Sequence, residues 1–161
     1  MPNTPLPEWE KLLASAAHLQ KMGSLDGIET GIRQLIREEP LETEVVEVGG
    51  VALRVPTQAE MLRIKAVLIV KRNATRDYLD FVALSELIGR DATLLALESF
   101  DRLYPQANGQ SVRQQLQVQL ANPLPYDLEE TNLREYKKLK PEYQDWAVIA
   151  EKCREIANVL W

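Results

Sequence analysis

Residues 57–72 are expected to form a helix with apolar side chains on almost every side. Thr57 and Glu60 have the spacing of a capping box and follow Pro56, which ends the preceding strand pattern. Most of the later positions are apolar: Met61, Leu62, Ile64 and the run from Ala66 to Val70. A helix of this kind must be covered on several sides by neighbouring elements. The segment therefore predicts a buried helix inside a packed domain.

Residues 44–55 favour a β-hairpin. Two valine-rich runs flank Gly49-Gly50, a pair that tolerates the positive φ angles of a two-residue turn. Pairing across this turn gives one apolar face, on which the opposite residues are Val48 with Val51 and Val46 with Leu53. The other face is mixed. We expect the apolar face of the hairpin to cover a core.

Helical patterns fill most of the remaining chain. Apolar spacing and capping residues predict helices over 8–22, 75–88, 91–104, 111–121 and 127–139, and a last helix from Pro141 onward. Residues 23–27 resemble a turn, and residues 28–36 favour a strand. We expect an α+β fold that is predominantly α-helical, with the 44–55 hairpin packed against a helical bundle. We expect a single domain over 1–161, with an opening helix and hairpin in 1–56 and a helical subdomain in 57–161.

Composition limits the class of protein. The chain has 161 residues and a net charge of −5, which argues against general coating of nucleic acid and leaves specific nucleic-acid binding undecided. No apolar run approaches the roughly 18 residues of a membrane-spanning helix. The start of the sequence lacks a basic stretch followed by an apolar one, and Cys153 is the single cysteine. These features predict a cytoplasmic chain with no membrane partner. We expect Cys153 to be a buried structural thiol and the single histidine, His18, to be a partly exposed helix residue.

A cationic segment stands out in this acidic chain. Residues 61–76 contain five basic residues and no acid. Lys65 and Arg72 are seven positions apart, so on a helix they lie within about 20° of each other. The acids Asp77 and Asp80 follow in the next predicted helix. Two interpretations remain open: structural ion pairs between the two helices, or a site for phosphate or nucleotide.

The same residues resemble a known family. Lys65-Ala-x-Leu, Arg72 and Arg76-Asp77-Tyr-Leu-Asp80 are similar to the carboxy-terminal motifs of the AbiEii nucleotidyltransferases, toxins of abortive-infection toxin–antitoxin pairs. The hairpin with Arg54-Val-Pro-Thr and the opening segment 7–20 also resemble that family. The resemblance covers chiefly residues 50–90. It implies that Lys65, Arg72, Arg76, Asp77 and Asp80 lie on the nucleotide and phosphate side of a transferase site.

The resemblance also implies chemistry for which residues are missing. An intact family member would bind Mg²⁺ and a nucleoside triphosphate, with the metal held by an Asp-x-Asp pair on one strand. This sequence contains no Asp-x-Asp. Gly23-Ser24 could imitate the glycine-rich turn of such a site, and Glu29 is the remaining candidate for a metal-binding carboxylate. We therefore assign no catalytic residue, no metal site beyond Glu29 and no certain cofactor.

Two functional hypotheses from different classes follow. The first is a shortened AbiEii-like nucleotidyltransferase that is inactive alone, with an antitoxin or a second copy of the chain as its partner. Its status as an enzyme stays open, because the missing region could be supplied in trans. The second is a non-enzymatic helical protein-interaction module, in which the cationic residues form internal ion pairs only.

Overall fold

The computed structural model describes residues 21–25, 28–32, 37, 39–136 and 139–160. The chain forms two compact units, Met1–Glu38 and Glu39–Trp161, and each is described by itself. Helices dominate the described ranges, and the strands form two antiparallel hairpins. The predicted α+β class is therefore confirmed. The single-domain organisation stays a prediction.

The first unit contains a hairpin of β1 (Lys21–Leu25) and β2 (Ile28–Ile32). The strand predicted over 28–36 is confirmed as far as Ile32. The turn predicted over 23–27 is wrong at its first three residues, because they pair with β2 as part of β1. Most of the predicted helix 8–22, including His18, lies outside the described residues, and its last two positions belong to β1.

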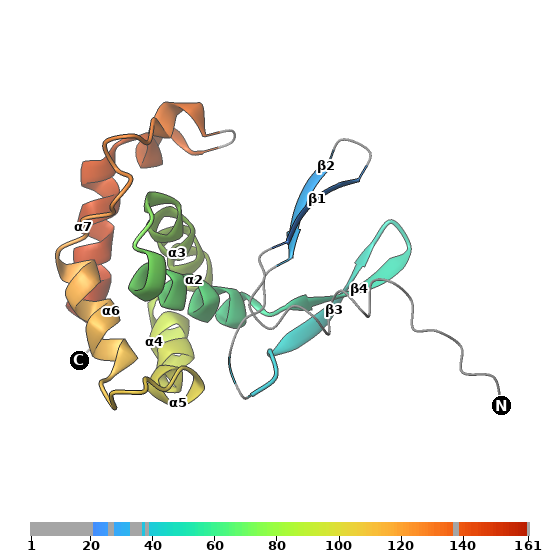
Figure 1. The fold of residues 1–161 in the computed structure, drawn as a ribbon, viewed down its shortest axis with the longest axis horizontal. Helices are drawn as coiled ribbons and strands as arrows, with labels where there is room; N and C mark the ends of the chain where they lie inside the picture. Colours follow the sequence, from blue (N-terminus) through green and yellow to red (C-terminus); the bar gives the residue numbers. More distant parts are fainter. Residues whose placement is uncertain (1–20, 26–27, 33–36, 38, 137–138, 161) are drawn as a thin grey trace. The chain divides into compact units, whose positions relative to one another are not determined.

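The second unit begins with a hairpin of β3 (Thr43–Val48) and β4 (Val51–Pro56) (Figure 1). Gly49 and Gly50 form the turn with φ of 59° and 79°, values that glycine adopts without strain. The predicted register is confirmed, with Val48 opposite Val51 and Val46 opposite Leu53. The apolar face does not cover a core, however, because Val48 is 59% exposed and Leu53 is 44% exposed. Figure 1 shows the reason: the hairpin extends away from the helices that follow it.

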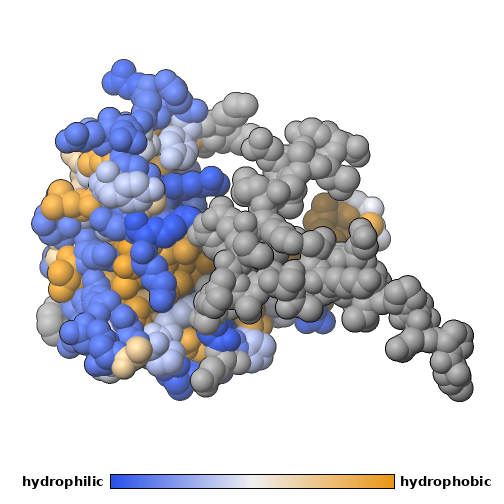
Figure 2. Space-filling view, in the orientation of Figure 1, coloured by the Kyte–Doolittle hydropathy of each residue, from blue (hydrophilic) through white to orange (hydrophobic). Residues whose placement is uncertain are grey.

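Six α-helices follow within the described residues: α2 (Gln58–Arg72), α3 (Thr75–Ile88), α4 (Arg90–Glu98), α5 (Phe100–Leu103), α6 (Val112–Ala121) and α7 (Trp146–Ala157). As its apolar circumference predicts, α2 lies at the centre and packs against α3, α4 and α6. The largest fully buried side chains include Leu62, Tyr78, Phe81 and Phe100. Figure 2 shows mostly hydrophilic residues on one outer face of these helices, with apolar residues gathered in patches between them.

Local signals located three of these helices correctly. The bounds of α2, α3 and α6 agree with the predictions for 57–72, 75–88 and 111–121. The Thr57 hydroxyl accepts a hydrogen bond from the Glu60 amide at 3.1 Å, as the capping-box spacing predicts. Glu60 does not complete the box, because its carboxylate accepts from the Glu42 amide and from Arg63 instead.

Of two other helix predictions, one is confirmed except for a break and the other is wrong. The segment 91–104 is helical, but it forms two helices that meet at Ser99, and the first of them begins one residue earlier than predicted, after Gly89 with φ of 84°. The segment 127–139 forms turns and a short 3₁₀ helix, η1 (Leu133–Glu135), instead of an α-helix. The carboxylate of Asp127, the first residue of the predicted helix, binds Thr75 of α3.

The last helix begins later than predicted. Pro141 starts a 3₁₀ helix, η2 (Pro141–Gln144), and Asp145 then caps α7 by accepting a hydrogen bond from the Ala147 amide at 2.9 Å. The inner side of α7 belongs to the core: Ile149, Ala150, Cys153 and Ala157 are buried. Trp146 contacts the ring of Tyr78 edge-on, with centroids 5.8 Å apart.

None of the helices in the described ranges combines the length and the apolar character needed to cross a bilayer.

Candidate functional site

The strongest charged contact predicted from sequence joins α2 to α3. Arg72 donates two hydrogen bonds to the Asp77 carboxylate, from Nε at 2.8 Å and from a terminal guanidinium nitrogen at 2.7 Å. The Asp77 side chain is fully buried, whereas that of Arg72 is 36% exposed. The hydrogen bond to Asp77 raises the pKa of Arg72 above its ordinary value. This fork-shaped pair holds the carboxy-terminal end of α2 against the start of α3.

A second pair joins the same helices nearer their middle. Lys65 Nζ lies 2.7 Å from an Asp80 carboxylate oxygen, and Arg76 Nε lies 3.8 Å from the same oxygen. Lys65 and Arg72 thus both reach acids of α3, as their seven-residue spacing predicts. Among the described contacts, each of the three cations already has a carboxylate partner. The arrangement is that of ion pairs between helices.

The surroundings of Lys65 are apolar. A groove of about 370 Å³ beside the Lys65–Asp80 pair is lined mainly by Met61, Ile64, Leu84 and Leu87. A phosphate site needs several hydrogen-bond donors that converge on one point. The single cationic donor lining this groove, Lys65, is engaged by Asp80. The contacts therefore give no geometric support to a phosphate site at these residues.

Polar side chains from distant segments organise the corner between α2 and α3. Asn73 adopts the left-handed conformation, with φ of 52°, which asparagine tolerates better than most residues. Its side chain donates to the Leu124 carbonyl at 2.7 Å and accepts from the Tyr78 hydroxyl at 2.5 Å. The amide and hydroxyl of Thr75 both donate to one Asp127 oxygen at 2.7 Å.

These contacts lower the pKa of the Asp127 carboxylate. Partial burial alone would raise the pKa of Asp127, but the hydrogen bonds from Thr75, together with the charge of Arg72, lower the pKa below its ordinary value. Asp127 thereby acts as a cap for α3 supplied from a loop about 50 residues away. Sequence reasoning missed this role, because no local pattern connects the two positions.

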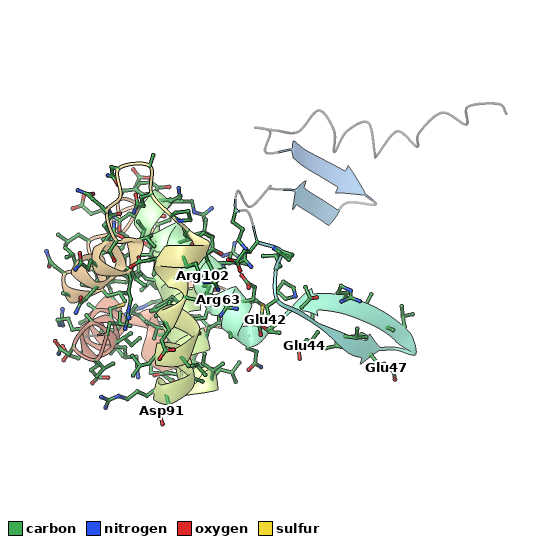
Figure 3. The ribbon with its side chains drawn as sticks, turned by 90° about the horizontal axis from the view of Figure 1, so that it is seen from below. Glu42, Glu44, Glu47, Arg63, Asp91 and Arg102 are labelled. Carbon is green, nitrogen blue, oxygen red and sulfur yellow. The ribbon has the colours of Figure 1, made fainter. Side chains whose placement is uncertain are left out.

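A buried arginine attaches the β3–β4 hairpin to the helices. One terminal nitrogen of Arg63 lies 2.6 Å from a Glu42 oxygen and 3.0 Å from a Glu60 oxygen, and the other donates to the Ala96 carbonyl at 3.4 Å. Arg63 is 7% exposed. Figure 3 shows Arg63 and Glu42 close together where the chain passes from the hairpin to the helices. This cluster fixes the base of the hairpin, and it too was missed from the sequence.

A cavity beside α3 has one of the described ion pairs, Glu86 with Lys152, among its lining residues. It measures about 640 Å³ and lies between α3, the start of α4 and α7. Its lining includes Val82 and Ile156. Glu86, another lining residue, accepts hydrogen bonds from the Tyr143 hydroxyl and from Lys152 Nζ. The hydrogen bond to Glu86 raises the pKa of Lys152 above its ordinary value.

The described residues contain no group of three or more His, Cys, Asp or Glu side chains that could hold a metal ion. Glu29, the candidate metal ligand from the sequence, is in β2 opposite Ser24, and its side chain lies outside the description. Cys153 is fully buried, and burial raises the pKa of its thiol to about 12. The structural role predicted for this cysteine agrees with its position in the core.

Comparison with curated proteins finds relatives among mycobacterial transport proteins. The chain is 32% identical to the heme uptake protein MmpL11 of Mycobacterium tuberculosis, in an alignment that covers 97% of this chain and 16% of that protein. It is 33% identical to the mycolic acid-containing lipids exporter MmpL11 of Mycolicibacterium smegmatis, over 75% of this chain and 13% of the exporter. The chain thus spans about a sixth or less of the length of these relatives. No family model and no solved structure matches the chain.

These relatives overturn the resemblance to AbiEii. That resemblance rested on about forty residues, whereas the similarity to MmpL11 extends over nearly the whole chain. A shortened nucleotidyltransferase of a toxin–antitoxin pair is therefore the wrong interpretation, and the alternative of a helical interaction module gains no support from these names. The motif misled because a lysine and an arginine facing two aspartates is also what ion pairing between neighbouring helices requires. The curated proteins that this chain resembles are transport proteins named MmpL11.

Proposed function

We propose that this chain forms an extramembrane domain that serves an MmpL11-like transport protein. The observation that carries the proposal is the 32% identity over 97% of the chain. The aligned part includes residues from both compact units. The buried ion pairs and caps described above are the contacts of a stably folded body, and such a body suits a domain attached to a larger transporter.

The proposal concerns the class of protein and not its cargo. One relative is named for heme uptake and another for export of mycolic acid-containing lipids. These names differ in both cargo and direction, so we carry neither over to this chain. For its compartment we propose the cytoplasmic side of the membrane, because the single cysteine is a buried free thiol, which is common in reducing compartments.

A chimera of the Mycolicibacterium smegmatis exporter tests the proposal. The segment of the exporter that aligns with this chain is deleted in one strain and replaced by this chain in another. We expect deletion to reduce export of mycolic acid-containing lipids and replacement to restore it. A chimera with Phe81→Asp, which places a charge in the core, should fail to restore export.

The matched control is Val118→Lys, which changes a side chain that is 70% exposed on α6 and should leave restoration intact. The proposal is wrong if deletion of the segment leaves export unchanged. It is also wrong if the replacement chimera accumulates in the membrane at the normal level and exports nothing.

A further inference from the structure

The loop between α5 and α6 contains the pair Asn108-Gly109, which places an amide side chain beside an unhindered backbone nitrogen. It is the single Asn-Gly pair in the sequence, and both residues are exposed. The Gly109 nitrogen directly follows Asn108 in the chain, so its attack on the Asn108 Cγ closes a five-membered ring. Glycine favours this approach, because it has no Cβ beside the attacking nitrogen.

Hydrogen bonds already hold the side chain of Asn108. Its Oδ1 accepts from the Gln110 amide at 3.0 Å, and its Nδ2 donates to Gln110 Oε1 at 3.1 Å. When a nitrogen adds to Cγ, negative charge develops on Oδ1. The Gln110 amide is a donor that already lies against that atom and can stabilise the charge. The contacts therefore prepare the carbonyl group of Asn108 for nucleophilic attack.

One contact opposes the reaction. The Gly109 amide donates to the Gln106 carbonyl at 2.9 Å, so the attacking nitrogen is held in a turn. The net contribution of one hydrogen bond of this kind corresponds to about tenfold or less in an equilibrium constant. The turn therefore slows the attack without preventing it.

We propose that Asn108 is a site of spontaneous covalent modification, at which its amide is converted to a mixture of aspartate and isoaspartate. The Gly109 nitrogen gives up its proton to solvent and bonds to the Asn108 Cγ, and the Cγ–Nδ2 bond breaks with release of ammonia. Water then opens the cyclic imide. Cleavage of the new Cγ–N bond gives aspartate, whereas cleavage of the original peptide bond gives isoaspartate. One water is consumed for each ammonia released, and no group is oxidised or reduced.

Asn132 provides an internal comparison. Its Oδ1 accepts from the Arg134 amide at 3.2 Å and its Nδ2 donates to Glu135 at 2.8 Å, so its side chain is bonded much as that of Asn108 is. Asn132 is exposed as well. The residue that follows it is Leu133, whose branched side chain is 6% exposed and hinders the approach of the Leu133 nitrogen. We therefore expect Asn132 to remain an amide under conditions that convert Asn108.

The modification affects the contacts that hold the start of α6. The side chain of Gln115, on α6, accepts from Gln106 at 2.6 Å and donates to Gln110 at 3.0 Å. Isoaspartate lengthens the main chain between Asn108 and Gly109 by one carbon, which displaces Gln110 relative to Gln115. Aspartate adds a charge but leaves the main chain as it was. Isoaspartate is therefore the product that loosens the loop.

Incubation of the purified, folded chain at mildly alkaline pH tests the inference, with peptide mass spectrometry as the measurement. We expect the Asn108 peptide to gain the mass of an amide-to-acid conversion and to separate into aspartate and isoaspartate forms. The Asn132 peptide should stay unchanged. The rate should rise with pH, because the deprotonated Gly109 nitrogen is the nucleophile. Each conversion also adds one negative charge to the net charge of −5, which ion-exchange chromatography of the intact chain detects.

Asn108→Gln is the matched control variant. Glutamine keeps the amide but adds one carbon, so the attack would have to close a six-membered ring, and we expect the charge change to disappear. Because position 108 is exposed in a loop, the far-UV circular dichroism of the variant should match that of the wild type.

Two results would overturn the proposal. The first is an Asn108 that remains an amide in the folded chain over about ten times the period in which an unfolded peptide of the same sequence converts, because the turn would then block the attack. The second is conversion of Asn132 as fast as Asn108, because Gly109 would then not determine the site.

Discussion

The helical body and the β3–β4 hairpin use apolar residues in opposite ways. In the helical body, α2 is apolar on almost every side, and α3, α4 and α6 cover it. In the hairpin, one face is just as consistently apolar, yet Val48 and Val51 are more than half exposed. A hydrophobic period therefore shows which side of an element is apolar, but it does not show whether that side is buried.

The two regions should also differ in the contacts that stabilise them. Buried apolar packing and charged pairs stabilise the helices, whereas the hairpin has its backbone ladder, its glycine turn and its anchored base. Isolated two-stranded hairpins are marginal in water. We therefore expect the helical body to carry the stability of the second unit.

The largest effect should come from the centre of the helical body. Phe81 is fully buried on α3, so Phe81→Ala removes a large side chain and leaves a cavity. We expect a loss of about 3–5 kcal/mol in the free energy of unfolding. Urea denaturation measures it. A loss below about 1 kcal/mol, the size expected at a site that can relax, would show that the core is not packed as described.

The next largest effect should distinguish the Arg72–Asp77 pair from the more exposed Lys65–Asp80 pair. Arg72→Met leaves the buried Asp77 carboxylate without its cation. We expect the free energy of unfolding to fall by about 2 kcal/mol, less than for a fully buried pair, because Arg72 is 36% exposed. Lys65→Met affects a more exposed pair and should cost less than about 1 kcal/mol. A double-mutant cycle with Asp77→Asn isolates the coupling. Equal costs for the two single variants would contradict the assigned difference in burial.

A smaller effect should depend on pH. Asp127 caps α3 with a pKa lowered from 3.8, so its contribution is present above that value and is lost as pH falls through the lower pKa of the folded state. Asp127→Asn should therefore cost about 1 kcal/mol at pH 7 and almost nothing in strong acid. Thermal unfolding of both proteins from pH 7 to pH 2 measures the difference. A difference that grows toward low pH would have the wrong sign.

The smallest effect should come from the hairpin in dilute solution. Val48→Ala removes methyl groups that are already mostly in water, so the monomer should change by no more than about 0.5 kcal/mol in its free energy of unfolding. Urea denaturation at low micromolar concentration measures it. A cost close to that of Phe81→Ala would mean that the Val48 side of the hairpin is buried within the monomer.

Local sequence signals were sufficient for the elements whose ends are set locally. The Thr57 cap and the Gly49-Gly50 turn gave correct bounds for α2 and the hairpin, and apolar spacing gave those of α3. They failed where a distant residue decides the structure. Asp127 looked like the start of a helix, but its carboxylate is used by Thr75, 52 positions earlier in the chain.

The candidate site shows the same limit. The spacing of Lys65 and Arg72 correctly placed both on the side of α2 that meets α3, and Asp77 and Asp80 are their partners. Spacing alone could not decide between ion pairing and nucleotide chemistry, because both use cations and acids at helical intervals. The Arg63 cluster was missed, because its partner Glu42 lies in the segment before β3.

Amide hydrogen exchange of the wild-type chain at low micromolar concentration tests most directly whether the helical body and the hairpin are separate in stability. We predict that the buried amides of α2, α3 and α6 open only with global unfolding, at one shared free energy that falls in Phe81→Ala. The β3–β4 amides should open at a lower free energy that Phe81→Ala leaves unchanged. If the hairpin amides instead share the opening free energy of the helices and fall with it, the two regions are one cooperative unit and the account is wrong.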